Sequence, residues 1–169
     1  MHLRPLTDRD LPDLQELLDA DPAYARRVTG ADPEPDGAAH LLAGRPEGLP
    51  AEDKLVLGVC DGAGLAAVID VLRGWPDLAT AHIGLLQVHA GRQGAGVGRR
   101  AHDLLLDLVR GWPGITQLRA AIVATNAATA DPFWTAMGYR PAGPPAPYRA
   151  GDTATQVAVW TRPVPRSPR

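Results

Sequence analysis

Residues 91–98 read GRQGAGVG and place four glycines in eight positions. They follow an apolar run, IGLLQVH, and precede a stretch with helical periodicity, RRAHDLLLDLVRGW. Glycine loses more backbone entropy on folding than any other residue, so such a concentration needs a reason. The two ordinary reasons are a tight turn and an anion held on the amides at a helix N-terminus. The segment therefore predicts a strand–loop–helix unit whose loop is a turn or an anion site.

The rest of the chain sets limits on the class of protein. Its 169 residues are enough for one domain with an ordinary core. The net charge of −2 does not indicate nucleic acid or an anionic membrane as a partner. One cysteine, Cys60, excludes an internal disulfide framework, and no Cys/His cluster suggests a metal. The start, MHLRPLTDRD, lacks an apolar targeting segment, so we expect a cytoplasmic protein.

Hydrophobic periodicity predicts an α/β fold in one domain over residues 1–162, with a disordered tail over 163–169. The expected strands are 2–6, 54–60, 65–73, 80–89, 117–125 and 153–162, with 54–60 and 65–73 as a hairpin. The expected helices are 7–21, 22–30, 97–112 and 131–139, the last with Asp131 as cap and Pro132 in its first position. Residues 31–53 and 143–149 are expected to be irregular, with one helical turn at 38–42.

Known anion-binding loops can be compared with the glycine segment. A Walker loop needs a lysine after its last glycine, and the only lysine of the chain is Lys54. A dinucleotide fingerprint is present superficially as Gly96-x-Gly98-x-x-Ala101. Its glycines come too far after strand 80–89, and strand 117–125 ends without the acidic residue that binds a ribose. A nucleotide-binding oxidoreductase is therefore disfavoured.

The sequence LLQVHAGRQGAGVGRRA, residues 85–101, resembles the signature of the GNAT N-acetyltransferase superfamily. In that family a strand runs into Gln/Arg-x-x-Gly-x-Gly/Ala and then into a helix, and Gln93, Gly96 and Gly98 occupy those positions. The resemblance implies that the loop amides and the helix dipole hold the pyrophosphate of acetyl-CoA. The residues that inherit this role are Gln93, Gly94, Ala95, Gly96, Val97, Gly98 and Arg99.

A second segment, NAATADPFWTAMGYRP, is similar to the other signature of that family. Asn126 is its asparagine, and Phe133 and Trp134 are its aromatic pair; all three are expected to contact the cofactor. Many members have tyrosine where this chain has Trp134, and that tyrosine often protonates the leaving thiolate. An indole cannot do so, which leaves Tyr139, Tyr148 or no residue as the general acid. Together the signatures imply a GNAT fold: a mixed, mostly antiparallel sheet with a splayed pair of parallel strands and flanking helices.

The resemblance also places the chemistry on strand 80–89. The pantetheine arm is expected to enter the gap beside strand 117–125 and to bond to main-chain groups at Leu86, Gln87 and Val88. The Val88 amide would polarise the thioester oxygen. Strict alternation directs His82, Gly84, Leu86 and Val88 to one face and Ala81, Ile83 and Leu85 to the other.

Two titratable residues are candidates for the catalytic machinery. His82 occupies the position of a common general base in the family, and a neutral imidazole with a pKa near 6.5 suits that role; a satisfied sheet histidine is the other interpretation. Asp70 lies within an apolar strand, where acids are rarely buried unpaired, and either orients a basic acceptor or faces solvent. His89 is expected to be structural.

The sequence thus predicts an N-acetyltransferase that uses acetyl-CoA and a primary amine of a small molecule. The acids of residues 31–53 would attract a cationic amine, although a solvated loop explains them equally well. The alternative is a GNAT-fold module that binds acyl-CoA without turnover. A homodimer is left open.

Overall fold

The computed structural model describes residues 1–151 and 153–165. Its strands are β1 (His2–Pro5), β2 (Lys54–Asp61), β3 (Gly64–Arg73), β4 (Thr80–Val88), β5 (Gln117–Val123), β6 (Arg140–Pro141), β7 (Ala146–Ala150) and β8 (Thr153–Pro163). Its α-helices are α1 (Leu11–Asp19), α2 (Pro22–Thr29), α3 (Gly37–Ala43), α4 (Val97–Arg110) and α5 (Ala127–Ala136). This order is the α/β pattern expected from the sequence.

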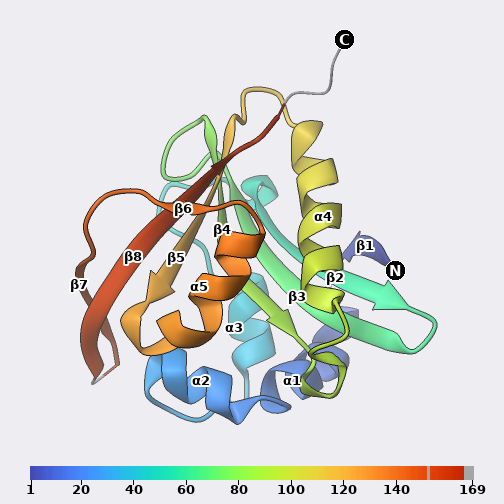
Figure 1. Cartoon of the computed structure of the whole chain (residues 1–169). Helices are drawn as coiled ribbons and strands as arrows, with labels where there is room; N and C mark the ends of the chain where they lie inside the picture. The colour runs from blue at the N-terminus through green and yellow to red at the C-terminus, as the bar shows by residue number, and fades with distance from the viewer. Residues whose placement is uncertain (152, 166–169) are drawn as a thin grey trace.

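The strands form one mixed sheet in the order β1-β2-β3-β4-β5-β8-β6, with β7 paired to β8 (Figure 1). All pairs in the described chain are antiparallel except β4 with β5. That parallel pair extends only from Thr80 and Gln117 to Ile83 and Ala120. Beyond it the two strands diverge, and Figure 1 shows them separating toward the end where α2 and α5 lie. The splayed pair expected from the resemblance is confirmed.

Apolar side chains cover both faces of the sheet. The larger core joins the sheet to α4 and α5, with Leu105 and Trp134 among its buried members. A smaller core packs Leu14 and Leu17 of α1 and Ala38 of α3 on the other face. Because both faces are covered, the end of the β4–β5 gap is the natural place for a ligand to enter.

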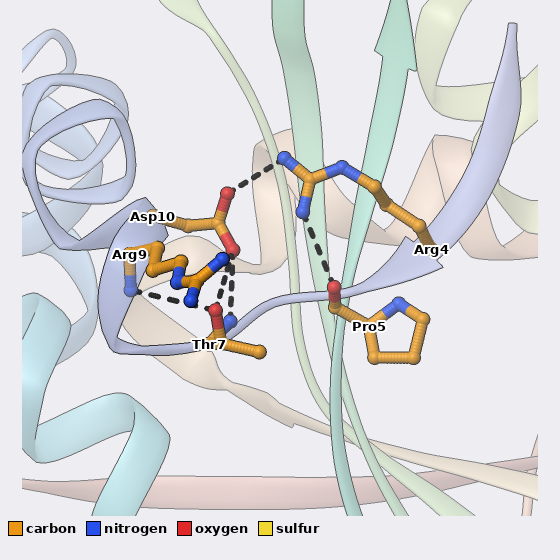
Figure 2. A network of polar contacts seen from close by, with 5 residues as sticks. All are labelled: Arg4, Pro5, Thr7, Arg9 and Asp10. Carbon is orange, nitrogen blue, oxygen red and sulfur yellow. Dashed lines mark hydrogen bonds and ion pairs between the residues drawn. The ribbon is translucent and has the colours of Figure 1, made fainter.

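The connection from β1 to α1 is fixed by a polar network (Figure 2). Thr7 and Asp10 form a capping box around a 3-10 turn, in which the Thr7 amide donates to the Asp10 carboxylate over 2.8 Å. Arg4 donates to the same carboxylate over 2.6 Å. Side-chain and backbone hydrogen bonds stabilise the charged carboxylate and lower the pKa of Asp10 to about 2. The network orients α1 against the sheet.

Three expected elements differ from the structure. The last helix begins at Ala127 rather than Asp131, and Pro132 lies inside it. Residues 143–149 are not wholly irregular, because β7 pairs along β8. Residues 37–43 form a longer helix than the expected single turn. In each case packing against neighbouring elements outweighs local composition.

The C-terminal end also departs from the expectation. Strand β8 includes Pro163, and the amide of Val164 donates to the carbonyl of Thr116 over 2.8 Å. The order therefore extends beyond residue 162, and the remainder of the expected tail, residues 166–169, lies outside the described residues. Within the described chain, no helix has the length and apolar character needed to cross a membrane.

Candidate acyl-CoA site

A cleft of about 830 Å³ opens where β4 and β5 diverge. Its walls come from α2, β4, β5, α5, β7 and the loop before α4. Of the predicted site residues, the cleft is lined by His82, Leu86, Gln87, Val88, Gln93, Gly94, Gly96, Val97, Gly98, Arg99, Asn126, Phe133 and Trp134. Asp70, Ala95 and Tyr139 do not line it. The structure therefore gathers residues from both sequence signatures around one hollow.

The loop before α4 has the conformation of an anion-binding turn. Gly94 and Gly96 have φ angles of 75° and 77°, which residues with a side chain rarely adopt. A Cβ atom at either glycine would meet nothing within 4 Å, so open space lies over this backbone. Gly96 precedes the first turn of α4 and has no side chain to cap the helix. The free amides and the helix dipole are thus available to an anion.

Beyond Ile83, the edge of β4 offers backbone groups that have no strand partner to the same cleft. The amide of His89 donates to the carbonyl of Ala66 on β3 over 2.9 Å. Because backbone groups alternate along an antiparallel strand, those of Gln87 also face β3, and those of Leu86 and Val88 face the gap. The Gln93 side chain confirms this direction, since its amide donates to the Val88 carbonyl over 3.3 Å.

A bulge at Gly84 changes the expected alternation on β4. Asp70 pairs with Leu85 and Val71 pairs with Ile83, so Gly84 is an extra residue. Leu85 consequently packs in the smaller core, whereas Leu86 packs with Ile83 in the larger one. The expectation that His82, Leu86 and Val88 share a face is wrong, because the bulge exchanges the faces between His82 and Leu86.

The second signature lines the same cleft and contacts the start of α4. Asn126 accepts a hydrogen bond of 2.9 Å from Nε of Arg27, which ties α2 to the start of α5. Phe133 packs so close to Gly98 that a Cβ there would lie 3.2 Å from its ring. Trp134 is buried, with its ring centroid 4.8 Å from that of Tyr139. Phe133 and Trp134 therefore support the loop as well as lining the cleft.

His82 is buried in a corner with Arg119 and Trp75. Nη1 of Arg119 lies 2.9 Å from Nδ1 of His82, and its guanidinium lies 5.2 Å from the Trp75 ring centroid. Arginine can only donate, so Nδ1 must accept and a neutral His82 carries its hydrogen on Nε2. Burial, and then the charge of Arg119, lower the pKa of His82 to about 4, below the 6.5 expected from the sequence. His82 is therefore neutral near pH 7.

Asp70 is buried beneath the cleft. Lys54 Nζ lies 2.9 Å from Asp70 Oδ1, a close ion pair whose geometry is not that of an aligned hydrogen bond. Burial raises the pKa of Asp70, and Lys54 opposes that rise. The solvated interpretation of Asp70 is therefore wrong, and its partner is the single lysine of the chain.

The two tyrosines considered as general acids have different positions. Tyr139 is 1% exposed, and its hydroxyl lies 3.1 Å from Nε2 of His102. Burial raises the pKa of Tyr139. Tyr148 lies on β7, is 41% exposed and lines the cleft. Of these two tyrosines, only Tyr148 lines the cleft. His89 is structural as expected, with Nδ1 accepting from the Gly91 amide over 3.1 Å.

Sequence reasoning missed Arg119 as a residue of the cleft. The available signal was a cation inside the otherwise apolar strand QLRAAIV. The charged side chains that line the cleft are Asp21, Arg27, Arg92, Arg99 and Arg119. The acids of residues 31–53 do not line it, and several pair elsewhere, as Glu34 does with His40 over 2.7 Å. The cleft is cationic.

Comparison with known proteins agrees with this geometry. A family model described as "Acetyltransferase (GNAT) domain" matches residues 1–131. The chain belongs to this GNAT family. The match includes the whole glycine loop and the Asn126–Asp131 part of the second signature. Among curated proteins, no sequence matches the chain.

Solved GNAT structures share the fold. An acetyltransferase from Thermus thermophilus is 23% identical, with a TM-score of 0.74 over 96% of this chain and 97% of that one. The ribosomal-protein-S18-alanine N-acetyltransferase of Escherichia coli is 20% identical, with a TM-score of 0.65 over 99% and 96%. A spermidine N-acetyltransferase from Vibrio cholerae, solved with CoA and spermine, is 14% identical, with a TM-score of 0.73 over 96% and 94%. At these identities the likeness concerns the fold.

Proposed function

We propose that this GNAT protein is an N-acetyltransferase that transfers the acetyl group of acetyl-CoA to the primary amine of a small molecule. The observation that carries the proposal is that one cleft combines the uncapped start of α4 with the unpaired edge of β4. The first fits a pyrophosphate, and the second fits an extended chain of amide groups. Acetyl-CoA is a ligand that has both parts, which supports the proposal.

The residues present fit the pyrophosphate. Open space lies over the backbone of Gly94 and Gly96, where the loop amides lead into the first turn of α4, and Arg99 adds a positive charge to the cleft wall. Asn126 and Phe133 line the same cleft. Gln93 is held by Asp21, which accepts from its side-chain amide over 3.0 Å. Together with its hydrogen bond to the Val88 carbonyl, this contact ties the loop to the start of α2 and the end of β4.

The β4 edge would hold and polarise the thioester. Acetyl-CoA supplies an acyl group on a thiol that leaves readily, because thiols have a pKa near 8.5. In the reaction the C–S bond breaks and a C–N bond forms, while the amine loses one proton and the thiolate gains one. The Val88 amide faces the gap and would donate to the thioester oxygen. We assign the protonation of the thiolate to Tyr148, which lines the cleft.

The proton lost by the amine is assigned to water in the open cleft. A general base needs a free lone pair, and Arg119 occupies Nδ1 of His82 while Nε2 carries the hydrogen. A pKa near 4 would also make His82 a weak base at neutral pH. Asp70 is paired with Lys54 away from the cleft. His82 is therefore not assigned the role of general base, and Asp70 is not assigned a role in orienting the acceptor.

The shape of the cleft favours a small acceptor. Tyr24 of α2 and Tyr148 of β7 both line the cleft and narrow it. Helix α2 is followed by residues 31–53, and β7 lies largely within residues 143–149, the two regions that the sequence analysis expected to be irregular. Burial raises the pKa of Tyr24 to about 12, which keeps its hydroxyl protonated. Robust acetylation of a ribosomal-protein peptide, with no small amine accepted, would contradict this assignment.

The same His82 geometry favours a second candidate, an acyl-CoA-binding module without turnover. An assay of thiol release from acetyl-CoA with a panel of small primary amines separates the two functions. We expect amine-dependent release together with acetyl-CoA binding. Binding without release from any amine would favour the module, and absence of both would exclude each function.

A further inference from the structure

We propose that Arg119 and His82 form a binding site for a carboxylate carried by the substrate. The inference rests on the proposed acetyl transfer and specifies its substrate class. It replaces the cationic amine considered from the sequence with a substrate that bears an acid group, on either the amine or the acyl group. The hydrogen-bonding capacity, position and charge of this corner of the cleft all favour such a ligand.

Arg119 has most of its hydrogen-bonding capacity free. A guanidinium has five N–H donors, and among the described residues its one side-chain hydrogen bond goes to His82. No described carboxylate lies within ion-pair distance of it, whereas Arg73 and Arg92 have such partners in Asp53 and Asp61. Arg119 is half-buried on a cleft wall. A desolvated cation without a counter-ion is costly, and a planar fork matches a carboxylate.

The neighbouring groups present donors rather than acceptors. The hydrogen bond from Arg119 fixes the tautomer of His82, so its Nε2–H is a second donor. Trp75 packs against both residues, with its ring centroid 4.9 Å from that of His82 and 5.2 Å from the Arg119 guanidinium. The ring excludes water and holds the guanidinium plane in place. A corner of this kind binds an anion and excludes an ammonium group.

The corner lies where a substrate would extend beyond the thioester. His82 and Arg119 are register partners, one position before the last pair, Ile83 and Ala120, and the gap begins there. The loop amides proposed to bind the pyrophosphate lie beyond the other end of β4, after Val88. A chain that enters from the loop along the β4 edge therefore reaches this pair at its reacting end.

Among the described residues, the one acid on the cleft wall is already engaged. Asp21 accepts from the Tyr24 amide over 3.0 Å and from Gln93 over 3.0 Å, at the loop end of the cleft. Within that part of the chain, Arg119 and His82 are thus free of competition from a protein carboxylate. The carboxylate has two sources: an amino-acid-like acceptor, or an acyl group that ends in an acid.

Matched substrates separate these sources. In the first arm, thiol release from acetyl-CoA is measured with α-amino acids and with the amines formed by their decarboxylation, such as alanine and ethylamine. In the second arm, succinyl-CoA is compared with butyryl-CoA, which has the same carbon count and no acid. Both arms use the wild type, R119Q, R119K and the control R9Q, which removes an exposed arginine of the 3-10 turn before α1.

We expect the wild type to prefer the carboxylated partner of one arm by about 10- to 100-fold in kcat/KM, the usual worth of a charge-assisted hydrogen bond. R119Q should reduce that ratio to within a few-fold while retaining turnover of the uncharged partner, R119K should keep part of it, and R9Q should keep all of it. If Arg119 has only a structural role, R119Q would lower kcat/KM equally for both substrates of a pair and leave their ratio unchanged. That result would overturn the proposal. Equal use of both partners by the wild type in both arms would overturn it too.

The failure of acetyl transfer is distinguishable from the failure of this site. If no pair releases thiol, the proposed function fails, and the site is tested by melting temperature with CoA and N-acetylalanine or N-ethylacetamide. Stabilisation by N-acetylalanine alone, lost in R119Q but kept in R9Q, supports the carboxylate site. Equal effects of these two compounds, together with equal effects of succinyl-CoA and butyryl-CoA, contradict it. Melting curves without ligand identify any variant that does not fold.

Discussion

Oδ2 of Asp70 lies 2.8 Å from the position that a Cβ atom of residue 84 would occupy. Gly84 is the extra residue of the bulge in β4, and the Asp70 carboxylate behind it is buried with Lys54. A glycine is therefore required here by a close approach and not by its φ angle. The bulge in turn exchanges the faces of β4 next to the cleft.

The first prediction concerns this contact. Gly84→Ala should lower the free energy of unfolding by about 1–3 kcal/mol, because the methyl group displaces a carboxylate held by Lys54. Gly62→Ala is the matched control, since a Cβ at Gly62 meets nothing within 4 Å and its cost should stay within about 0.5 kcal/mol. Denaturant unfolding measures both. Equal stability of Gly84→Ala and the wild type would show that Asp70 moves freely.

The second prediction concerns the pH dependence of turnover. Since burial and Arg119 lower the pKa of His82 to about 4, His82 is deprotonated throughout pH 5.5–8 and contributes no ionisation near 6.5 to the rate. His82→Gln, which retains an N–H donor, should keep kcat within a few-fold. A rise in rate through pH 6–7 that disappears in His82→Gln, with a loss of about 10²- to 10⁴-fold, would restore the general-base role.

A third prediction concerns acid stability. His102 is fully buried, and burial, followed by the charge of Arg162, lowers its pKa to about 4. In the unfolded chain a histidine has a pKa near 6.5 and binds the proton more readily than His102 does in the folded protein. The contribution of His102 to the free energy of unfolding is therefore complete above pH 6.5 and is lost as the pH falls toward 4. The loss should be on the order of 2–3 kcal/mol.

Two variants isolate this contribution. Tyr139→Phe removes the hydroxyl that contacts His102 but keeps the imidazole, so the acid-dependent loss should persist. Adding His102→Leu removes both polar groups together and should reduce the loss of stability between pH 6.5 and 4 by the His102 contribution. The part of the loss that belongs to His82, whose pKa is also lowered to about 4, should remain. Thermal melts across this range give the result. A double variant that loses as much stability in acid as Tyr139→Phe would assign the effect to other groups.

Sequence patterns located the elements that carry the cofactor loop, because glycine spacing and helical periodicity act locally. Gly30 ends α2 with a φ angle of 77°, and α4 begins after Gly96, as expected. The bulge at Gly84 was missed, although a glycine inside a strand pattern is a signal for a bulge or a close approach. The group that approaches it, the buried Asp70 carboxylate on β3, could not be identified from local sequence. Strand alternation alone contains no signal for an inserted residue.

The site residues outside the signatures depend on long-range register. Arg119 meets His82 because α4 brings β5 beside β4 with a particular offset, and local composition does not specify that offset. Helix α5 begins four residues before Asp131, because Thr125 donates to the Arg27 carbonyl and Asn126 accepts from Arg27. These contacts with α2 outweigh the preference of Pro132 for a first turn.

The central claim is that the loop before α4 binds the pyrophosphate of acetyl-CoA, and calorimetric titration tests it most directly. Wild-type protein should bind acetyl-CoA in the micromolar range or tighter, and Gly96→Val should lose at least about tenfold in affinity. Gly48→Val is the control, because Gly48 has a φ angle of 80° and equally open surroundings outside the cleft. It should be destabilised to a similar degree and bind acetyl-CoA normally. Binding of NAD or ATP in place of acetyl-CoA, or equal affinity in Gly96→Val and Gly48→Val, would contradict the claim.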